Sequence, residues 1–323
     1  MSTGKRKYLP VSVRQRLRNL RDKTGKEYQL LLTTYALERL LYRLSQSEYA
    51  DRFVLKGAML FVALTGKPHR ATRDLDLLGY GDASAEHIAR VFRQISTTSV
   101  EPDGMVFDPE GITVQAIRED QVYESQRVRL MARLDTAVFP ITVDIGFGDA
   151  VTPEAKRLTF PGLLDFPEPL VLAYPPETVV AEKLQALVYL GMRNSRMKDF
   201  YDLWLMARTF SFEGPVLIEA IRATFARRET NLPKDRPVAL RAQFADDPVK
   251  QTQWEGFLNR SGLSDAPMKL STVVETLNTF LTPLLSAAEV GGEYNQVWRG
   301  GGPWQSSEVP GGTDKKGNVK GRI

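Results

Sequence analysis

Two different spacings of apolar residues along the chain predict an α/β half followed by a helical half. Between residues 28 and 44 the apolar side chains recur three or four apart, which is the spacing of an amphipathic helix. A basic helix is expected just before it, over residues 11–23, because Gly25 is suited to end a helix. Further helices are predicted over residues 58–64 and 84–95.

Strands are predicted where polar and apolar residues alternate or where β-branched residues concentrate. The expected strands cover residues 52–57, 74–78, 113–117, 127–134 and 140–147. After Pro161 the pattern is that of helices, over residues 177–192, 198–210, 215–227, 249–259 and 270–285. The predicted fold class is therefore α/β, in its α+β form, with a mixed-sheet core followed by a helical lobe.

The same patterns divide the chain into four expected parts. These are N-terminal helices over 1–50, the core over 51–160, the helical lobe over 161–289 and a flexible Gly-rich tail over 290–323. The tail has little apolar content to bury, which favours a mobile segment. Trp298 and Trp304 are the exceptions, and they are candidates for docking onto the body.

Composition narrows the chemistry that the chain can support. Its 323 residues include no cysteine and only His69 and His87, which excludes disulfides, thiolate sites and zinc sites built on several histidines. Catalysis would then depend on carboxylates, lysine or hydroxyls. The sequence has no run of about 18 apolar residues and no apolar stretch behind the basic start, so we expect no membrane span, no signal peptide and a cytoplasmic location.

Basic residues gather in two segments, although the formal net charge is only +4. Nine of the first 26 residues are Lys or Arg, and the second group comprises Arg193, Arg196, Lys198, Arg222, Arg227 and Arg228. Such segments would suit contact with phosphates. Solvated helix faces are the alternative interpretation.

The central feature is a pair of aspartates separated by one residue in a predicted strand. Residues two apart share a face of a strand, so Asp74 and Asp76 point the same way while Leu75 and Leu77 face the core. Two adjacent carboxylates repel each other unless a cation lies between them. A divalent metal ion is the natural occupant, since Mg²⁺ favours one or two carboxylates plus substrate phosphates.

Asp144 is a third acid, within a strongly apolar predicted strand where an unpaired charge would be costly. Strand pairing that brings it beside Asp74 and Asp76 would complete a site for two metal ions, one at the attacking oxygen and one at the leaving pyrophosphate. A structural ion pair is the alternative role for Asp144.

Lys183 lies on the apolar face of its predicted helix, four residues from both Val179 and Leu187. It must extend to solvent, pair with an acid, or enter a cleft where its ammonium meets a phosphate. Arg196, Asp199 and Asp202 are three apart and share one side of the next helix, from which they would orient Lys183 or a nucleotide. Asp199 would alternatively stabilise the first turn of that helix.

Four segments of the chain together resemble the nucleotidyltransferase toxins of abortive-infection systems, the AbiEii/AbiGii type, within the DNA polymerase β-like superfamily. The segments are Leu55-Lys56-Gly57-Ala58, Arg70 to Asp76, Glu182-Lys183 and Arg196 to Asp202. Their order and rough spacing match the family between about Arg52 and Leu203. Two positions depart from the usual pattern, because Ala58 replaces a glycine or serine and Thr72 replaces serine.

The resemblance implies roles for individual residues. Asp74 and Asp76 would bind metal, as Mg²⁺ or Mn²⁺, with Asp144 added by the strand-pairing argument above. These three would act in catalysis together with Lys183 and Asp199. A nucleoside triphosphate would be the substrate. Its binding would involve Gly57, Ala58, Arg70, Thr72, Lys183, Arg196 and Asp202.

The family also implies a biological setting. It includes toxins of toxin–antitoxin systems that add nucleotides to the 3′ acceptor end of tRNA and so block translation. An RNA acceptor, most simply tRNA, and a cognate antitoxin are therefore the expected partners. Transfer of the nucleotide to a protein hydroxyl or to a small molecule is the alternative that the same metal site would support.

Two proteins of other classes compete with this interpretation. A phosphatase with Asp74 as nucleophile is disfavoured, because such enzymes have Thr or Val after the second Asp where this chain has Leu77. A non-catalytic RNA-binding module would have no need of three aspartates and Lys183. Labelling with nucleoside triphosphates distinguishes all of these alternatives.

Overall fold

A mixed eight-stranded sheet forms the core of the computed structural model, which describes residues 3–117, 125–263, 265–292 and 294–307. The strand order is β3-β5-β6-β2-β1-β8-β7, and β4 pairs with β5. The pairs β2/β6 and β1/β8 are parallel, and the others are antiparallel. The strands are β1 (Phe53–Lys56), β2 (Asp74–Gly79), β3 (Met105–Phe107), β4 (Thr113–Ala116), β5 (Ser125–Leu134), β6 (Ala137–Phe147), β7 (Lys156–Thr159) and β8 (Leu170–Ala173).

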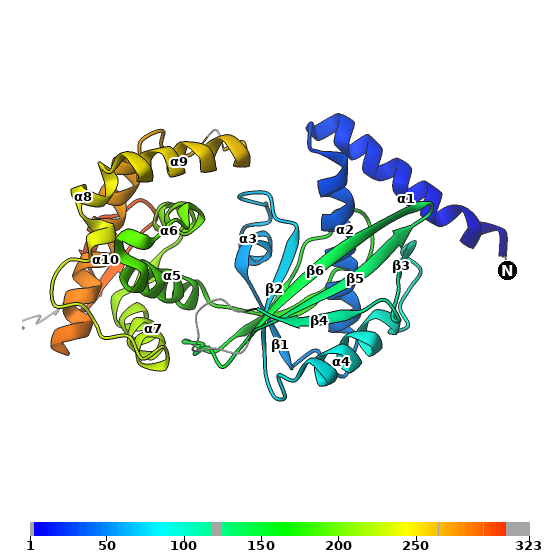
Figure 1. Cartoon of the computed structure of the whole chain (residues 1–323), viewed down its shortest axis with the longest axis horizontal. Coiled ribbons are helices and arrows are strands. Elements are labelled where there is room, and N and C mark those ends of the chain that lie inside the picture. Colours follow the sequence, from blue (N-terminus) through cyan, green and yellow to red (C-terminus); the bar gives the residue numbers. More distant parts are fainter. Residues whose placement is uncertain (1–2, 118–124, 264, 293, 308–323) are drawn as a thin grey trace, which may run out of the picture.

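The sheet buries one face because its longest strands alternate. In β6 the side chains of Phe139, Ile141, Val143 and Ile145 are buried, while the residues between them are more accessible. The helices α2 (Tyr28–Ser45) and α4 (Ala85–Thr97) pack against each other and against this sheet, and α1 (Thr3–Thr24) extends beyond it (Figure 1). The short helix α3 (Gly57–Thr65) follows β1 directly. Asp74, Asp76 and Asp144 lie on the side of the sheet that faces the second lobe.

The second lobe is helical and lies beside the edge of the sheet (Figure 1). Its helices are α5 (Pro176–Leu190), α6 (Met197–Thr209), α7 (Gly214–Arg227), α8 (Ala242–Ala245), α9 (Pro248–Ser261) and α10 (Leu270–Val290). Pro176 begins α5 at a position where proline costs no hydrogen bond, and Gly291 ends α10 in the left-handed conformation. The predicted α+β class, with its mixed sheet and helices, is confirmed.

Two expectations about the domain limits need correction. The sheet does not end near residue 160, because β8 belongs to it and pairs with β1 through Val54 and Leu55. The expected mobile tail is wrong for residues 294–307. There β10 (Gln296–Trp298) and β11 (Trp304–Ser306) form a small sheet with β9 (Phe212–Glu213). Residues 308–323 of the expected tail lie outside the described residues.

The two tryptophans explain why this segment docks. Trp298 is 1% exposed and donates a hydrogen bond from its indole N–H to the Ala207 carbonyl at 2.6 Å. Trp304 donates to the Phe280 carbonyl at 2.9 Å and its ring stacks on Phe280. Burial of these rings outweighs the low apolar content of the neighbouring residues. Within the described ranges, no helix is both long and apolar enough to cross a membrane.

Candidate active site

Strand register places four charged residues in one row across the sheet. Asp76 on β2 lies opposite Lys56 on β1 and also opposite Asp144 on β6. Asp144 in turn lies opposite Arg127 on β5. The row therefore reads Lys56, Asp76, Asp144, Arg127, with the two acids in the middle. All four line a cleft of about 770 Å³ between the sheet and the helical lobe.

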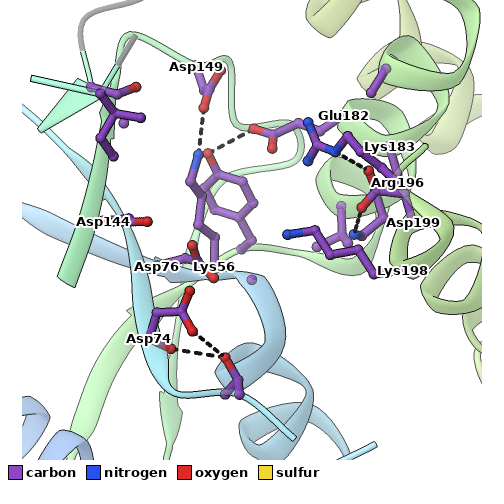
Figure 2. A pocket seen from close by; sticks show the side chains of 18 of the residues that line it. Lys56, Asp74, Asp76, Asp144, Asp149, Glu182, Lys183, Arg196, Lys198 and Asp199 are labelled. Carbon is purple, nitrogen blue, oxygen red and sulfur yellow. Dashed lines mark hydrogen bonds and ion pairs between the residues drawn. The ribbon is translucent and has the colours of Figure 1, made fainter. Parts of the chain in front are cut away.

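Asp74 joins these acids from two residues earlier on β2. Figure 2 shows Asp74, Asp76 and Asp144 on the sheet side of the cleft and Lys183, Arg196, Lys198 and Asp199 on the side of the helical lobe. The structure thus brings the three predicted aspartates to one cleft. That all three bind metal ions stays a prediction, and Asp144 differs from the other two because Arg127 contacts it.

Gly57 forms the turn from β1 into α3 beside the acids. Its φ of +70° lies in the region that favours glycine, and a β-carbon there would lie 2.6 Å from Cγ of Asp76. The first turn of α3, with its unpaired backbone N–H groups, can therefore approach the carboxylate closely. Gly57 lines the cleft, whereas Ala58 is 3% exposed and does not line it. Nucleotide binding at these two residues stays a prediction.

The electrostatics of Asp74 and Asp76 favour a cation. Burial, and then the neighbouring charge of Asp74, raise the pKa of Asp76 to about 6. Lys56 and Lys198 only partly offset this rise. Asp74 is oriented by the Thr72 hydroxyl and the Arg73 backbone N–H, which donate to its Oδ1 at 3.2 and 3.0 Å. Thr72 thus holds an aspartate in position and also lines the cleft.

Asp144 has a protein cation as its partner. The Arg127 guanidinium donates from Nε to Asp144 Oδ1 at 2.7 Å and from its terminal nitrogen to Oδ2 at 2.6 Å. This bidentate contact is the ion pair that the sequence left open as the alternative role. Arg127 was not predicted as this partner, because its place opposite Asp144 follows only from the pairing of β5 with β6.

Lys183 lies at the centre of a buried network on the helical lobe. Its ammonium contacts Asp199 at 2.7 Å and Asp202 at 2.9 Å, while Arg196 contacts Asp199 at 2.8 Å. Burial alone would lower the pKa of Lys183, but the charges of Asp199 and Asp202 outweigh it and raise that pKa. Lys183 therefore stays charged at the wall of the cleft.

Asp202 is the hub behind this wall. It accepts hydrogen bonds from Arg70 at 3.1 Å and contacts His69 Nε2 at 2.8 Å, in addition to Lys183. Burial would raise the pKa of Asp202, but Lys183 and Arg70 hold it well below its ordinary value. Arg70 lines the cleft, whereas Asp202 does not, and Asp202 holds Arg70 and Lys183 from behind. That Asp202 binds nucleotide stays a prediction.

A second charged cluster at the base of the cleft was not predicted as a site. Lys56 contacts Asp149 at 2.8 Å, and Arg228 contacts Asp149 at 2.9 Å and Glu182 at 3.4 Å. Lys56 and Glu182 belong to motifs that the sequence singled out, and Arg228 belongs to its second basic group. Asp149, two residues after β6, gave no local signal of its own.

Lys198 is a further cleft residue that the sequence included only among basic surface positions. It lies beside Asp199 on α6, is exposed, and lines the cleft. In Figure 2 its side chain extends from the helical lobe into the cleft. Its positive charge partly offsets the rise in the pKa of Asp76, which burial causes first.

The donor set fits a hard divalent cation at Asp74 and Asp76. Both supply oxygen ligands, and the pKa of Asp76 is raised first by burial and then by the charge of Asp74, two effects that a bound cation would offset. Asp144 faces the same cleft but has both oxygens bound to Arg127. Among the described residues, no group of three His, Cys, Asp or Glu side chains is placed to hold an ion alone. Water molecules, and substrate phosphates when the nucleotide is bound, would complete the coordination.

Together these features define a class of protein. Carboxylates that suit a divalent ion on one wall, and lysines and arginines that suit phosphates on the other, are the components of an enzyme of phosphoryl transfer. The model of one family, the nucleotidyl transferase AbiEii toxins of Type IV toxin–antitoxin systems, matches residues 39–281, more than half of the chain. The chain belongs to this family, as its resemblance predicted.

As a member of this family, the chain is a nucleotidyltransferase toxin of a toxin–antitoxin system. The family implies a nucleoside triphosphate substrate and an antitoxin partner. An enzyme is thereby favoured over the non-catalytic module. Among solved structures, JHP933 from Helicobacter pylori is similar, with a TM-score of 0.49 and 14% identity over 82% of this chain and 95% of that one. A candidate nucleotidyltransferase from H. pylori has the same score and identity, over 83% and 100%. No curated protein matches the chain.

Proposed function

We propose that the enzyme transfers a nucleotide from a nucleoside triphosphate to the 3′ acceptor end of tRNA, with Mg²⁺ or Mn²⁺ held by Asp74 and Asp76, and that this modification blocks translation. One observation carries the proposal. The repelling carboxylates of Asp74 and Asp76 face, across one cleft, the cationic wall that includes Lys183 and Arg196.

The cationic wall suits the triphosphate. Lys183 is fixed in place by two carboxylates, and Arg196 is 46% exposed beside it, so both present charge without needing to be ordered by the substrate. Arg70 and Lys198 add positive charge around them. Oriented charges of this kind stabilise the negative charge on the phosphate oxygens and on the leaving pyrophosphate in the transition state.

The reaction is a displacement at the α-phosphorus. A hydroxyl oxygen of the acceptor forms a bond to that phosphorus and releases its proton to solvent. The bond from the phosphorus to the bridging oxygen breaks, and pyrophosphate leaves with the electron pair. A divalent ion, when bound, supplies charge that favours the attacking oxygen and the leaving group. Thr72 holds Asp74 for this task, while Asp199 and Asp202 hold Lys183 and Arg196 against the phosphates.

The rim of the cleft supports a nucleic acid as acceptor. Glu27, at the turn between α1 and α2, lines the cleft and contacts Arg73, which is 65% exposed. Arg260 on α9 also lines the cleft, and the basic residues of α1, including Arg21 and Lys23, lead up to Glu27. Such a basic rim favours a polyanion over a neutral small molecule.

The experiment is a labelling reaction with each α-labelled nucleoside triphosphate, Mg²⁺, and either total RNA or total protein. We expect label on RNA of tRNA size with the wild type and none with Asp74→Ala. Label found on protein, or on a small molecule only, would contradict the tRNA acceptor and favour the alternative acceptors. Arg93→Ala, an exposed change on α4 outside the cleft, is the control and should label RNA like the wild type.

A further inference from the structure

In the row Lys56, Asp76, Asp144, Arg127, the cations at the two ends make different contacts. At one end Lys56 makes its contact with Asp149 and not with Asp76, its neighbour in the row. At the other end Arg127 binds its own neighbour, Asp144. The two central acids therefore differ in whether a protein cation is bound to them.

Arg127 uses the whole carboxylate of Asp144. Its two hydrogen bonds, at 2.7 and 2.6 Å, reach both oxygens in the parallel arrangement that a planar guanidinium favours. A guanidinium does not lose its proton in a protein, so this positive charge is permanent. A divalent cation that approached Asp144 would have to displace Arg127 or stand beside a like charge.

Asp74 and Asp76 present the opposite case. Thr72 and Arg73 engage Asp74 only with neutral donors, and Lys56, the cation opposite Asp76 in the row, contacts Asp149 instead. The demand for an added cation is thus concentrated at this pair.

We infer that Arg127 takes the place of a second metal ion, so that the enzyme binds a single divalent ion at Asp74 and Asp76 and leaves Asp144 to the guanidinium. The inference rests on the proposed ion at Asp74 and Asp76 and deepens it. It also gives Asp144 a positioning role: it fixes a permanent positive charge at the far end of the row, inside the substrate cleft.

The test is to count bound ions, with Mn²⁺ alone as the probe, by equilibrium binding followed through the spin resonance of free Mn²⁺. We expect one Mn²⁺ per wild-type chain. The double substitution Arg127→Gln with Asp144→Asn removes a neutral pair, so the affinity should stay within about twofold of wild type. Arg127→Gln alone exposes Asp144 and should raise the affinity about tenfold or add a second ion, since one ligand commonly changes metal affinity by that factor or more.

Three results would overturn the role of Arg127: two ions on the wild type, a loss of about tenfold in the double variant, as expected if Asp144 is a ligand, or an unchanged ion count and affinity in Arg127→Gln. Asp76→Asn addresses the ion site itself and should abolish binding. Wild-type binding in Asp76→Asn would overturn the proposed ion site, a failure that is distinct from those above. If Arg127→Gln does not fold, the double variant still decides the question.

Discussion

Gly57 and Asp76 approach each other so closely that residue 57 has no room for a side chain. A β-carbon on residue 57 would overlap the carboxylate, since it would lie 2.6 Å from Cγ of Asp76. The same contact brings the start of α3 to the acid that the site needs most. The glycine of this turn is thus explained by a neighbour that lies on another strand.

Gly57→Ala should therefore disable the enzyme. The substitution must move Asp76 or the first turn of α3, and we expect nucleotide transfer to fall at least about tenfold, as displacement of a catalytic group by about 1 Å does. Gly66→Ala is the matched control, because its φ is +73° but its β-carbon would meet nothing within 4 Å. It should lower stability by roughly 1 kcal/mol and leave the transfer rate of the folded enzyme unchanged. Equal rate losses in both variants would contradict the explanation.

Asp76→Asn should stabilise the protein while it abolishes transfer. The pKa of Asp76 is raised to about 6 from 3.8, so the folded chain holds the proton more tightly than the unfolded chain. Protonated Asp76 therefore favours the folded state, and this contribution to stability is full below about pH 4 and is lost as the pH rises through about 6. At pH 7.5 the free energy of unfolding of Asp76→Asn should exceed that of wild type by about 1–2 kcal/mol. This difference should shrink as the pH approaches 4. Urea unfolding at several pH values measures this.

The same pair of proteins tests the proposed ion. Mg²⁺ or Mn²⁺ that binds only the folded chain must raise its melting temperature by mass action. We expect such a rise for wild type at pH 7.5 and none for Asp76→Asn. An equal rise in both would place the ion elsewhere.

The Lys183 network should tolerate a wide range of pH. Lys183 has a raised pKa, so its contribution is full below its ordinary value of 10.5 and is lost only as the pH rises through the higher folded value. Asp202 has a lowered pKa, so its contribution is full above 3.8 and is lost as the pH falls through the lower folded value.

Lys183→Met tests this network directly. It leaves Asp199 and Asp202 buried without their shared cation, which should cost about 3–5 kcal/mol at pH 7. Acid should then stabilise the variant, because protonation removes one of the two charges, whereas wild type should gain nothing from this network between pH 7 and 5. Chemical unfolding at both pH values decides it, and a variant that loses stability on acidification would contradict the account.

Local spacing predicted much of the fold and part of the site. The long helices were predicted because their apolar residues repeat over several turns. The strands β3, β7 and β8 were not predicted, because three or four residues are too few to show an alternating pattern. Asp74 and Asp76 were predicted as a pair because they share a strand. Lys56 and Asp149 are 93 residues apart, and Arg228 is 79 from Asp149, so only tertiary packing brings them together.

The docked segment also shows where composition misleads. Trp298→Ala should cost roughly 3–5 kcal/mol, because the ring is 1% exposed and its N–H is bound to Ala207. Tyr8→Ala, at a ring that is 71% exposed, should change stability by less than about 0.5 kcal/mol. Urea unfolding compares them, and a cost below about 1 kcal/mol for Trp298→Ala would contradict the packing described above.

The cluster at the base of the cleft joins the two lobes through one carboxylate, that of Asp149. Lys56 comes from the sheet and Arg228 follows α7 of the helical lobe, and both contact the one carboxylate. Burial would raise the pKa of Asp149, but the two cations outweigh it and lower that pKa. Asp149→Asn would leave two buried cations with one acid, Glu182, nearby.

We expect Asp149→Asn to cost about 3–5 kcal/mol at pH 7, as the loss of one partner from a buried ion pair does. Asp51→Asn is the control, since the Asp51 side chain is 72% exposed and pairs with Arg157 at the surface. This substitution should cost less than about 0.5 kcal/mol. Because carboxylate charge disappears in acid, the difference between Asp149→Asn and wild type should narrow only below about pH 4. A difference that is already lost at pH 5 would mean that the Asp149 charge does not hold the lobes together.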